Sequence, residues 1–527
     1  MAYVKISDLN FAQTLTGNEI LPVVQNGTSY KVSVSAVGGT GDTENINGRC
    51  NDISTGSNYS SIVGGKYNDV YGNCSFIGGG STNVLSADFG FIGGGTGHIA
   101  YSIGGFIGGG SGNDTCPNTC LDTIGGGNGN VVDSGFKLSF IGGGKSNFME
   151  TGNACASADS SFNNQGNTIV GGNQNSIGTK GNPLKGLPGM TKALCHNTVV
   201  GGYLNKISKF GTIANPLSAE DLESKYSFIG GGVNNGINGN YTAIVGGSNN
   251  KVYSGVKGGF VGGGVYNTIR NVDGTAGGNY SSIVGGCCNN ATGNCSNIGG
   301  GTLNTSSGDV ATIGGGGVNN ASGACSTIGG GIQNTASGDR SNVAGGGVNY
   351  ATGIGATIAG GFVNYAIGNC SSIGGGVNNR ADGFAATLGG GGDNIASGCY
   401  STLAGGVDNT ANGCRSTVAG GIQNTASGIA SNVGGGRKNT ASGNYSNVAG
   451  GCNNNLSASF GFIAGGCSNN LKTGHSNSQI LGSDITTVSG NMLHANTLYL
   501  SAAALPTTDP GVSGVVWRDG TDLKISL

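Results

Sequence analysis

The sequence predicts an all-β protein whose central region is a parallel β-solenoid or β-roll of about 24 coils, either left- or right-handed. Three observations support this fold class. An aliphatic anchor residue with glycines at the second and third places after it occurs 24 times. From Ile283 to Ile463 the anchors recur every 15 residues, a period too short for a helical repeat or a propeller blade. An asparagine lies six places after every anchor except one, where His98 replaces it.

Residues 1–45 lack the repeat and are expected to form a separate N-terminal segment. Alternating β-branched residues flank Asn26-Gly27, a pair typical of a two-residue hairpin turn. Charged residues stand where a secretory signal needs an apolar run, so we expect the chain to fold in the compartment where it is made.

Residues 46–482 are expected to form the solenoid, with two short strands and two tight turns in each coil. Alternation places Ser341 and Val343 on one side of the first strand, and Asn349 and Ala351 on one side of the second. Glycines after the anchor and before the next strand provide the turns. Because identical side chains stack in columns, the asparagines are expected to form a hydrogen-bonded ladder. The structural positions of the repeat are represented by Val343, Ile358, Ile373, Asn334, Asn349, Asn364, Asn379, Gly345 and Gly360.

The apolar core of such a coil is thin, since each coil contributes one branched aliphatic residue and a few small ones. Glycine also loses much conformational entropy on folding. We therefore expect a second source of stability in oligomerisation through a flat face of small residues, and we expect a homotrimer.

Three long insertions interrupt consecutive coils, at about residues 148–166, 176–196 and 206–226. Each enters after the asparagine and before the next anchor, so all three are expected to leave the solenoid from one edge. The third contains Ser218 and Asp221, which resemble a capping box at the start of a short helix. Loops on a rigid scaffold often recognise ligands. The candidate binding residues are Lys185, Met190, Lys192, His196, Lys206, Phe210 and Lys225. The alternative is that the insertions only cover the edge or contact other subunits of the trimer.

Residues 483–527 are expected to form a C-terminal cap. Two short strands around Asp519-Gly520 predict a hairpin that carries Trp517, the only tryptophan. Such a cap would cover the open edge of the last coil.

The 15 cysteines follow the register of the repeat. Cys399 and Cys414 are one period apart, as are Cys452 and Cys467. The favoured interpretation is that stacked, reduced cysteines act as small hydrophobic residues. Disulfides between adjacent coils are the alternative for these two pairs. We expect no metal and no cofactor, because no second cysteine pair has zinc-binding spacing and the histidines are isolated.

Composition excludes several other classes of protein. Glycine accounts for 113 of 527 residues, charged residues for 9%, and the net charge is −2. A nucleic-acid binder would need an excess of basic residues, and no apolar run is long enough to cross a membrane. Collagen is excluded because there is no Gly-X-Y period.

Two segments resemble known families. Ser7-Asp8-Leu9, the run from Leu15 to Gly27 and the strand from Lys31 to Val34 resemble the N-terminal segment of tailed-phage tail-fibre and related virion proteins, which commonly attaches the fibre to the particle. The ending from Leu505 to Leu527 looks like that of many phage structural proteins. The repeat region is similar to the heads of trimeric autotransporter adhesins, although their repeat is slightly shorter and less rich in glycine.

These resemblances imply a structural fibre or adhesin of a phage virion that attaches to the host surface. Its expected partners are other copies of the chain, tail or baseplate proteins at the N-terminus, and a glycan or protein of the host. We expect it in the virion after assembly in the host cytoplasm, or alternatively as an extracellular fibre. The alternative function is a self-assembling filament subunit without a receptor. We expect no enzyme, because the densest acidic cluster, Glu220, Asp221 and Glu223, is typical of a solvated helix face. An ice-binding surface is disfavoured because the column of threonines directly before the anchors is interrupted by other residues.

Overall fold

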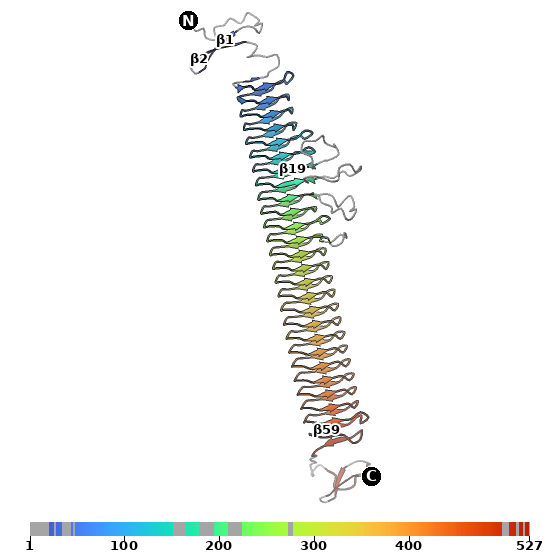
Figure 1. Ribbon diagram of the computed structural model, residues 1–527. Coiled ribbons are helices and arrows are strands. Elements are labelled where there is room, and N and C mark those ends of the chain that lie inside the picture. Colours follow the sequence, from blue (N-terminus) through green and yellow to red (C-terminus); the bar gives the residue numbers. More distant parts are fainter. Residues whose placement is uncertain are drawn as a thin grey trace. The chain divides into compact units, whose positions relative to one another are not determined.

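The computed structural model describes residues 48–150, 164–178, 194–208, 224–271 and 278–497, together with the short segments 20–25, 28–33, 44–45, 505–512, 516–519 and 522–525. Within these residues all regular structure is β, and no helix occurs. The chain divides into two compact units, residues 1–318 and 319–527, and each contains a parallel β-solenoid (Figure 1). The two units contain about 26 turns in all, with a spacing of about 15 residues, which confirms the predicted fold class.

Unit 1 contains two parallel ladders of short strands. The first ladder contains the anchor residues, and its strands are β3 (Glu44–Asn45), β6 (Ser61–Ile62), β9 (Phe76–Ile77), β11 (Phe91–Ile92), β13 (Phe106–Ile107), β15 (Thr123–Ile124), β18 (Phe140–Ile141), β21 (Thr168–Ile169), β24 (Thr198–Val199), β27 (Phe228–Ile229), β29 (Ala243–Ile244), β31 (Phe260–Val261), β33 (Ser282–Ile283), β35 (Asn297–Ile298) and β37 (Thr312–Ile313).

The second ladder of unit 1 follows the asparagines. Its strands are β5 (Asp52–Ile53), β8 (Asp69–Val70), β10 (Val84–Leu85), β12 (Ile99–Ala100), β14 (Asp114–Thr115), β16 (Val131–Val132), β19 (Phe148–Glu150), β22 (Ser176–Gly178), β25 (Lys206–Ile207), β28 (Gly236–Ile237), β30 (Lys251–Val252), β32 (Thr268–Ile269), β34 (Asn290–Ala291) and β36 (Thr305–Ser306). Three further parallel pairs lie outside the ladders: β4 (Gly48–Arg49) with β7 (Gly65–Lys66), β17 (Phe136–Lys137) with β20 (Asn164–Gln165), and β23 (Leu194–Cys195) with β26 (Ser224–Lys225).

The strands of unit 2 are spaced more regularly than those of unit 1. Its first ladder begins with β39 (Thr327–Ile328), repeats every 15 residues to β57 (Phe462–Ile463), and ends with β59 (Gln479–Leu481) and β60 (Leu493–Ala495). Its second ladder repeats every 15 residues from β38 (Asn320–Ala321) to β58 (Asn470–Leu471). The strands β3, β59 and β60 lack the Gly-Gly motif, so the ladders include turns that the motif does not mark. The sequence analysis had assigned β60 to the C-terminal segment.

The core of each turn consists of the columns that alternation predicted. Val343, Ile358 and Ile373 in the first ladder are fully buried, as is Ala351 in the second. Ser341, two places before the anchor, is also buried. Parallel pairing holds this register in unit 2, for example between Val343 and Ile358. Since one residue of slippage would turn the apolar set outward, burial of these columns fixes the register.

The asparagine column points inward and is hydrogen-bonded throughout the regular turns. Asn334, Asn349, Asn364 and Asn379 are fully buried. Asn349 Nδ2 donates to the carbonyls of Gly345 in its own turn (3.0 Å) and of Gly361 in the next (3.1 Å). Its Oδ1 accepts the main-chain N–H of Asn364 at 3.0 Å. The predicted ladder is therefore confirmed, although most of its bonds join a side chain to the main chain.

Besides glycine at the third place after the anchor, each regular turn has two left-handed places that are mostly not glycine. In unit 2 one lies five places after the anchor, such as Val348 with φ of 56°, and one twelve places after, such as Tyr400 with φ of 58°. Val348 N–H donates to Ile332 of the preceding turn (2.9 Å), whereas Asn342 N–H in a strand donates to Ala356 of the following turn (2.8 Å). The left-handed residues thus reverse the hydrogen-bonding direction between strands.

Two hairpins were expected at the ends of the chain, and both occur. Strands β1 (Ile20–Gln25) and β2 (Thr28–Ser33) pair antiparallel, with Gln25 opposite Thr28. Strands β61 (Val516–Asp519) and β62 (Asp522–Ile525) do the same, with Asp519 opposite Asp522.

Candidate functional site

The three long insertions interrupt consecutive turns of unit 1 at one position in the repeat. Each begins directly after a second-ladder strand, namely β19, β22 or β25. The described chain resumes at Asn164, Leu194 and Ser224, the first residues of β20, β23 and β26. Strands β23 and β26 pair in register and β20 pairs with β17, and each of β20, β23 and β26 begins four residues before the next first-ladder strand, so the chain returns to the solenoid at equivalent places. The edge formed by the strands on either side of the insertions is called the insertion edge below.

A stack of three rings follows the second and third insertions along this edge. His196 and Tyr226 have ring centroids 5.0 Å apart, and Tyr226 and Tyr241 have centroids 5.3 Å apart. The three residues occupy the left-handed place three residues before the anchor, with φ between 53° and 56°. Tyr226 is 53% exposed and Tyr241 is 61% exposed. Because each ring face covers its neighbour, the stack presents ring edges and the tyrosine hydroxyls to solvent.

The predicted lysines that the structure describes lie on different strands. Lys225 belongs to β26, opposite Cys195 of β23, and its N–H donates to Asn240 Oδ1 at 2.9 Å. It directly precedes Tyr226 in the chain. Lys206 belongs to β25 in the second ladder, between Ser176 and Gly236.

Only part of the predicted site can be placed. His196 follows β23 and Lys225 belongs to β26, both after an insertion, whereas Lys206 belongs to β25 before the third insertion, so all three lie on the insertion edge. Lys185, Met190, Lys192 and Phe210 lie outside the described residues, as do the capping box at Ser218 and the acidic cluster at Glu220, Asp221 and Glu223. The sequence analysis missed Tyr226 and Tyr241. Their signal was available, since both occupy the same place as His196 relative to the next anchor.

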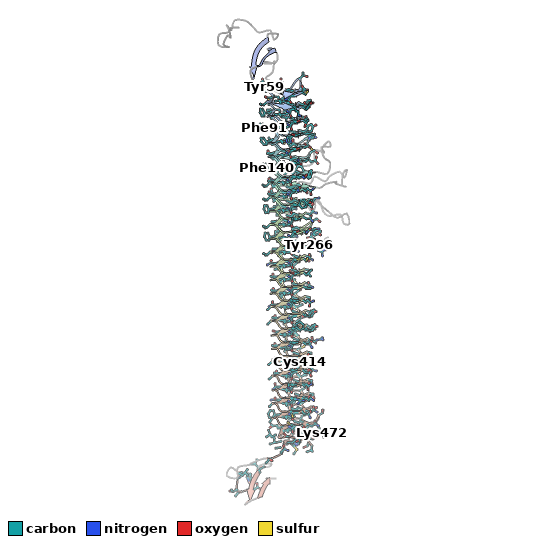
Figure 2. The ribbon with its side chains drawn as sticks, turned by 60° about the vertical axis from the view of Figure 1, so that its left-hand side comes forward. Tyr59, Phe91, Phe140, Tyr266, Cys414 and Lys472 are labelled. Carbon is teal, nitrogen blue, oxygen red and sulfur yellow. The ribbon has the colours of Figure 1, made fainter. Side chains whose placement is uncertain are left out.

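A second exposed aromatic group lies on the outer side of the first ladder in unit 1. Phe76, Phe91 and Phe106 stack on consecutive turns, with centroid distances of 5.2 and 4.9 Å. Phe140 occupies the same column, and Figure 2 labels it together with Phe91. In unit 2 this column carries mostly threonine, asparagine and serine, so its outer surface there is flat and polar.

Asp122 and His98 of unit 1 place titratable groups in the core. Asp122 is fully buried, and its carboxylate accepts hydrogen bonds from Ser139 N–H (2.9 Å) and Ser102 Oγ (3.2 Å). Burial raises the pKa of Asp122 to about 7. Burial also lowers the pKa of His98, which occupies the asparagine column. These groups are enclosed by the turns and have structural roles.

The described cysteines mostly have free thiols, as the favoured interpretation predicted, but these are exposed or half-buried and do not act as small hydrophobic residues of the core. Cys399, Cys414, Cys452 and Cys467 have free thiols. Cys116 is an exception because it is disulfide-bonded, so the interpretation of a fully reduced set is wrong for this residue. The Sγ atoms of Cys452 and Cys467 lie 2.7 Å apart, and this contact is the main reason that the pKa of Cys452 is raised.

The described part of the chain contains no cluster of three or more His, Cys, Asp or Glu residues suited to hold a metal ion. None of the described residues belongs to a helix with the length and apolarity that a membrane span requires.

Comparison with known proteins identifies no relative. No protein-family model matches the chain, and no curated protein is significantly similar to it in sequence.

Proposed function

We propose that the chain is a structural fibre or adhesin of a phage virion, located in the tail, that mediates attachment to the host surface. The N-terminal segment attaches the protein to other tail or baseplate proteins. The solenoid units act as spacers, and the insertion edge contacts a glycan or protein of the host. Three copies assemble as a homotrimer. The proposal assigns the chain no catalytic activity, and release of oligosaccharides from host capsule by the purified protein would contradict that part.

The observation that carries this proposal is the placement of the insertions. Most turns close with short connections, but three consecutive turns carry long segments at one position in the repeat. The same edge presents the exposed stack of His196, Tyr226 and Tyr241 and the cation of Lys225. A spacer alone needs no clustering of long insertions and exposed aromatic residues on one edge, whereas a recognition surface does. The N-terminal resemblance supports the assignment to a virion.

Imaging of virions tests the location. An antibody raised against residues 176–226 is applied to negatively stained particles, with an antibody against the unit 2 turns as the reference. We expect both antibodies to label a projecting fibre. Absence of both labels from virions would refute the proposal.

The alternative is a self-assembling filament subunit without a receptor. The flat outer column of unit 2, with Thr387, Thr402 and Thr417, favours this second candidate because small side chains allow lateral packing. Light scattering over a dilution series separates the two functions. Indefinite assembly of the purified chain would favour the filament, and a discrete oligomer that binds host cells would favour the adhesin.

A further inference from the structure

Cys452 and Cys467 lie in one column of unit 2, four places after the anchors of neighbouring turns. Their main chains are bridged in parallel. Cys452 N–H donates to Gly466 (2.9 Å), and Ser468 N–H donates to the carbonyl of Cys452 (2.9 Å). Cys467 N–H donates to Ser483 Oγ at 3.0 Å. The backbone of both residues is therefore held by the turns on either side.

The two thiols face each other across one turn spacing. The Sγ atoms are 2.7 Å apart, Cys467 is exposed and Cys452 is half-buried. Paired strands are separated by about 4.8 Å, which falls within the Cα separation of about 4.4 to 6.8 Å that disulfides span. Sulfur atoms that are not bonded do not normally approach so closely. A covalent bond would relieve this contact between two residues whose main chains are already paired.

Two other cysteine pairs lack this geometry. Cys399 and Cys414 are also exposed and one turn apart, but no contact joins their sulfur atoms in the described structure. Cys414 is labelled in Figure 2. Cys287 and Cys288 have Sγ atoms 3.2 Å apart. Because they are consecutive, their Cα atoms are about 3.8 Å apart, which is below the usual range for a disulfide.

We propose that Cys452 and Cys467 are a modification site at which a small-molecule disulfide, such as oxidised glutathione, introduces an inter-turn disulfide into the folded chain. One cysteine loses its proton, and its thiolate attacks a sulfur of oxidised glutathione and releases one glutathione thiolate. The second cysteine then attacks the mixed disulfide, forms the Cys452–Cys467 bond and releases the second glutathione. The oxidant takes up two electrons, and each released thiolate takes up one proton.

The bond would join the turn of β55 (Asn447–Val448) to the turn of β57, close to the end of the second ladder at β58. Turns at the end of a solenoid have a neighbour on one side only and are expected to open before internal ones. A disulfide that closes a short loop restricts that opening. The inferred consequence is a redox-dependent reinforcement of the C-terminal turns of unit 2.

The test uses the full chain, purified under reducing conditions and then exposed to oxidised glutathione. Free thiols are alkylated and counted by mass spectrometry, and peptides are mapped without reduction. We expect the chain to lose two alkylation sites. We also expect the peptide map to show one disulfide, which links Cys452 to Cys467. Cleavage of the oxidised chain beyond residue 452 by a protease should be at least about tenfold slower than cleavage of the reduced chain.

The variants separate this site from the other cysteines. C452S and C467S should each abolish both the cross-link and the protection, whereas the matched C399S and C414S variants should leave both unchanged. Three of the substituted side chains are exposed and Cys452 is half-buried, so we expect all four variants to fold, and circular dichroism verifies this. The proposal would be overturned if Cys452 and Cys467 stayed alkylated after oxidation, if Cys399 and Cys414 cross-linked equally, or if the bond joined two chains.

Discussion

At the residue scale, the two glycines after each anchor have different roles. Gly346 has a φ of 86°, and a Cβ atom there would overlap the carbonyl oxygen of Gly361 in the next turn. Gly345 has open space around it and contributes mainly its carbonyl, which accepts from Asn349. The repeat therefore requires glycine for steric reasons at the third place after the anchor, more than at the second.

This difference predicts unequal effects of alanine at adjacent positions. Gly346→Ala should lower the free energy of unfolding by more than about 2 kcal/mol, because the left-handed backbone and the overlap both oppose it. Gly345→Ala should change it by less than about 1 kcal/mol. Urea denaturation of the two variants measures this difference. Equal losses of unfolding free energy in the two variants would show that the close approach of Gly361 does not exclude a side chain at residue 346.

His98 provides a second prediction at this scale. Its Nδ1 accepts the N–H of Asn113 at 3.0 Å, but its Nε2 is directed at the carbonyls of Gly94 and Gly110 without reaching hydrogen-bond geometry. An asparagine at this place could donate to both carbonyls, as the side chain of Asn83 donates to the carbonyls of Gly79 and Gly95. His98→Asn should therefore raise the free energy of unfolding by about 1 kcal/mol at neutral pH.

The same substitution should alter the pH dependence of stability. Because the pKa of His98 is lower in the folded chain than its ordinary value of 6.5, the unfolded chain binds the proton more readily. The contribution of His98 to the stability should therefore fall as pH decreases below about 6.5, and His98→Asn should remove that contribution. Thermal unfolding of the native sequence and of His98→Asn, measured between pH 5 and 8, checks this prediction. It would be contradicted if the stabilities of the two proteins changed with pH in parallel.

At the scale of the element, the asparagine column connects successive turns. Asn364 Nδ2 donates to Gly360 and Gly376, both at 3.0 Å, and Oδ1 accepts from Asn379 N–H at 3.0 Å. Asn364→Ala would remove the donor to the half-buried Gly360 carbonyl and the acceptor for the N–H of Asn379, whereas the Gly376 carbonyl would keep its bond from Phe362 N–H. We expect a loss of about 2–4 kcal/mol in the free energy of unfolding.

The matched control is Thr357→Ala, which alters an outward residue of the same turn. It should cost less than about 1 kcal/mol. Hydrogen exchange then locates the effect, since the amides of Asn364 and Asn379 should lose protection in the asparagine variant. An equal loss of stability in both variants would contradict the role assigned to the column.

Much of each turn could be predicted because the repeat is nearly strict. The buried places of Val343 and Asn349 follow from the 15-residue period and from alternation alone. The left-handed turn residues could not be predicted, since Val348, Tyr400 and Arg415 share no side-chain chemistry. Their conformation arises from main-chain bonds to the preceding turn, which have no local sequence signal.

The candidate site was less predictable for a related reason. Insertion lengths located the edge, and position after an insertion identified His196. Tyr226 and Tyr241 join it only because the turns stack them at equal spacing, which becomes visible once the register is applied to outward columns. Likewise, the register placed Cys452 and Cys467 in one column, but only side-chain coordinates distinguish them from Cys399 and Cys414.

At the scale of the whole molecule, the two units divide the chain by regularity. Unit 2 keeps the 15-residue step from β39 to β57, whereas unit 1 carries the long insertions. Because an inward column accepts little beyond aliphatic residues, alanine, serine and asparagine, few charged residues lie inside the described turns, and Asp122 is one of the exceptions. The charged content of 9% follows from that constraint. It is compatible with a spacer that concentrates recognition on one edge.

Host adsorption tests the proposed function most directly. Virions are mixed with host cells in the presence of the purified chain, or of a variant whose three insertions are shortened to the 15-residue turn length seen from Ile283 onward. Circular dichroism verifies that both proteins are folded. We predict that the native chain slows adsorption in a dose-dependent manner and that the shortened variant does not. Equal inhibition by both chains, or by neither, would contradict the assignment of host attachment to the insertion edge.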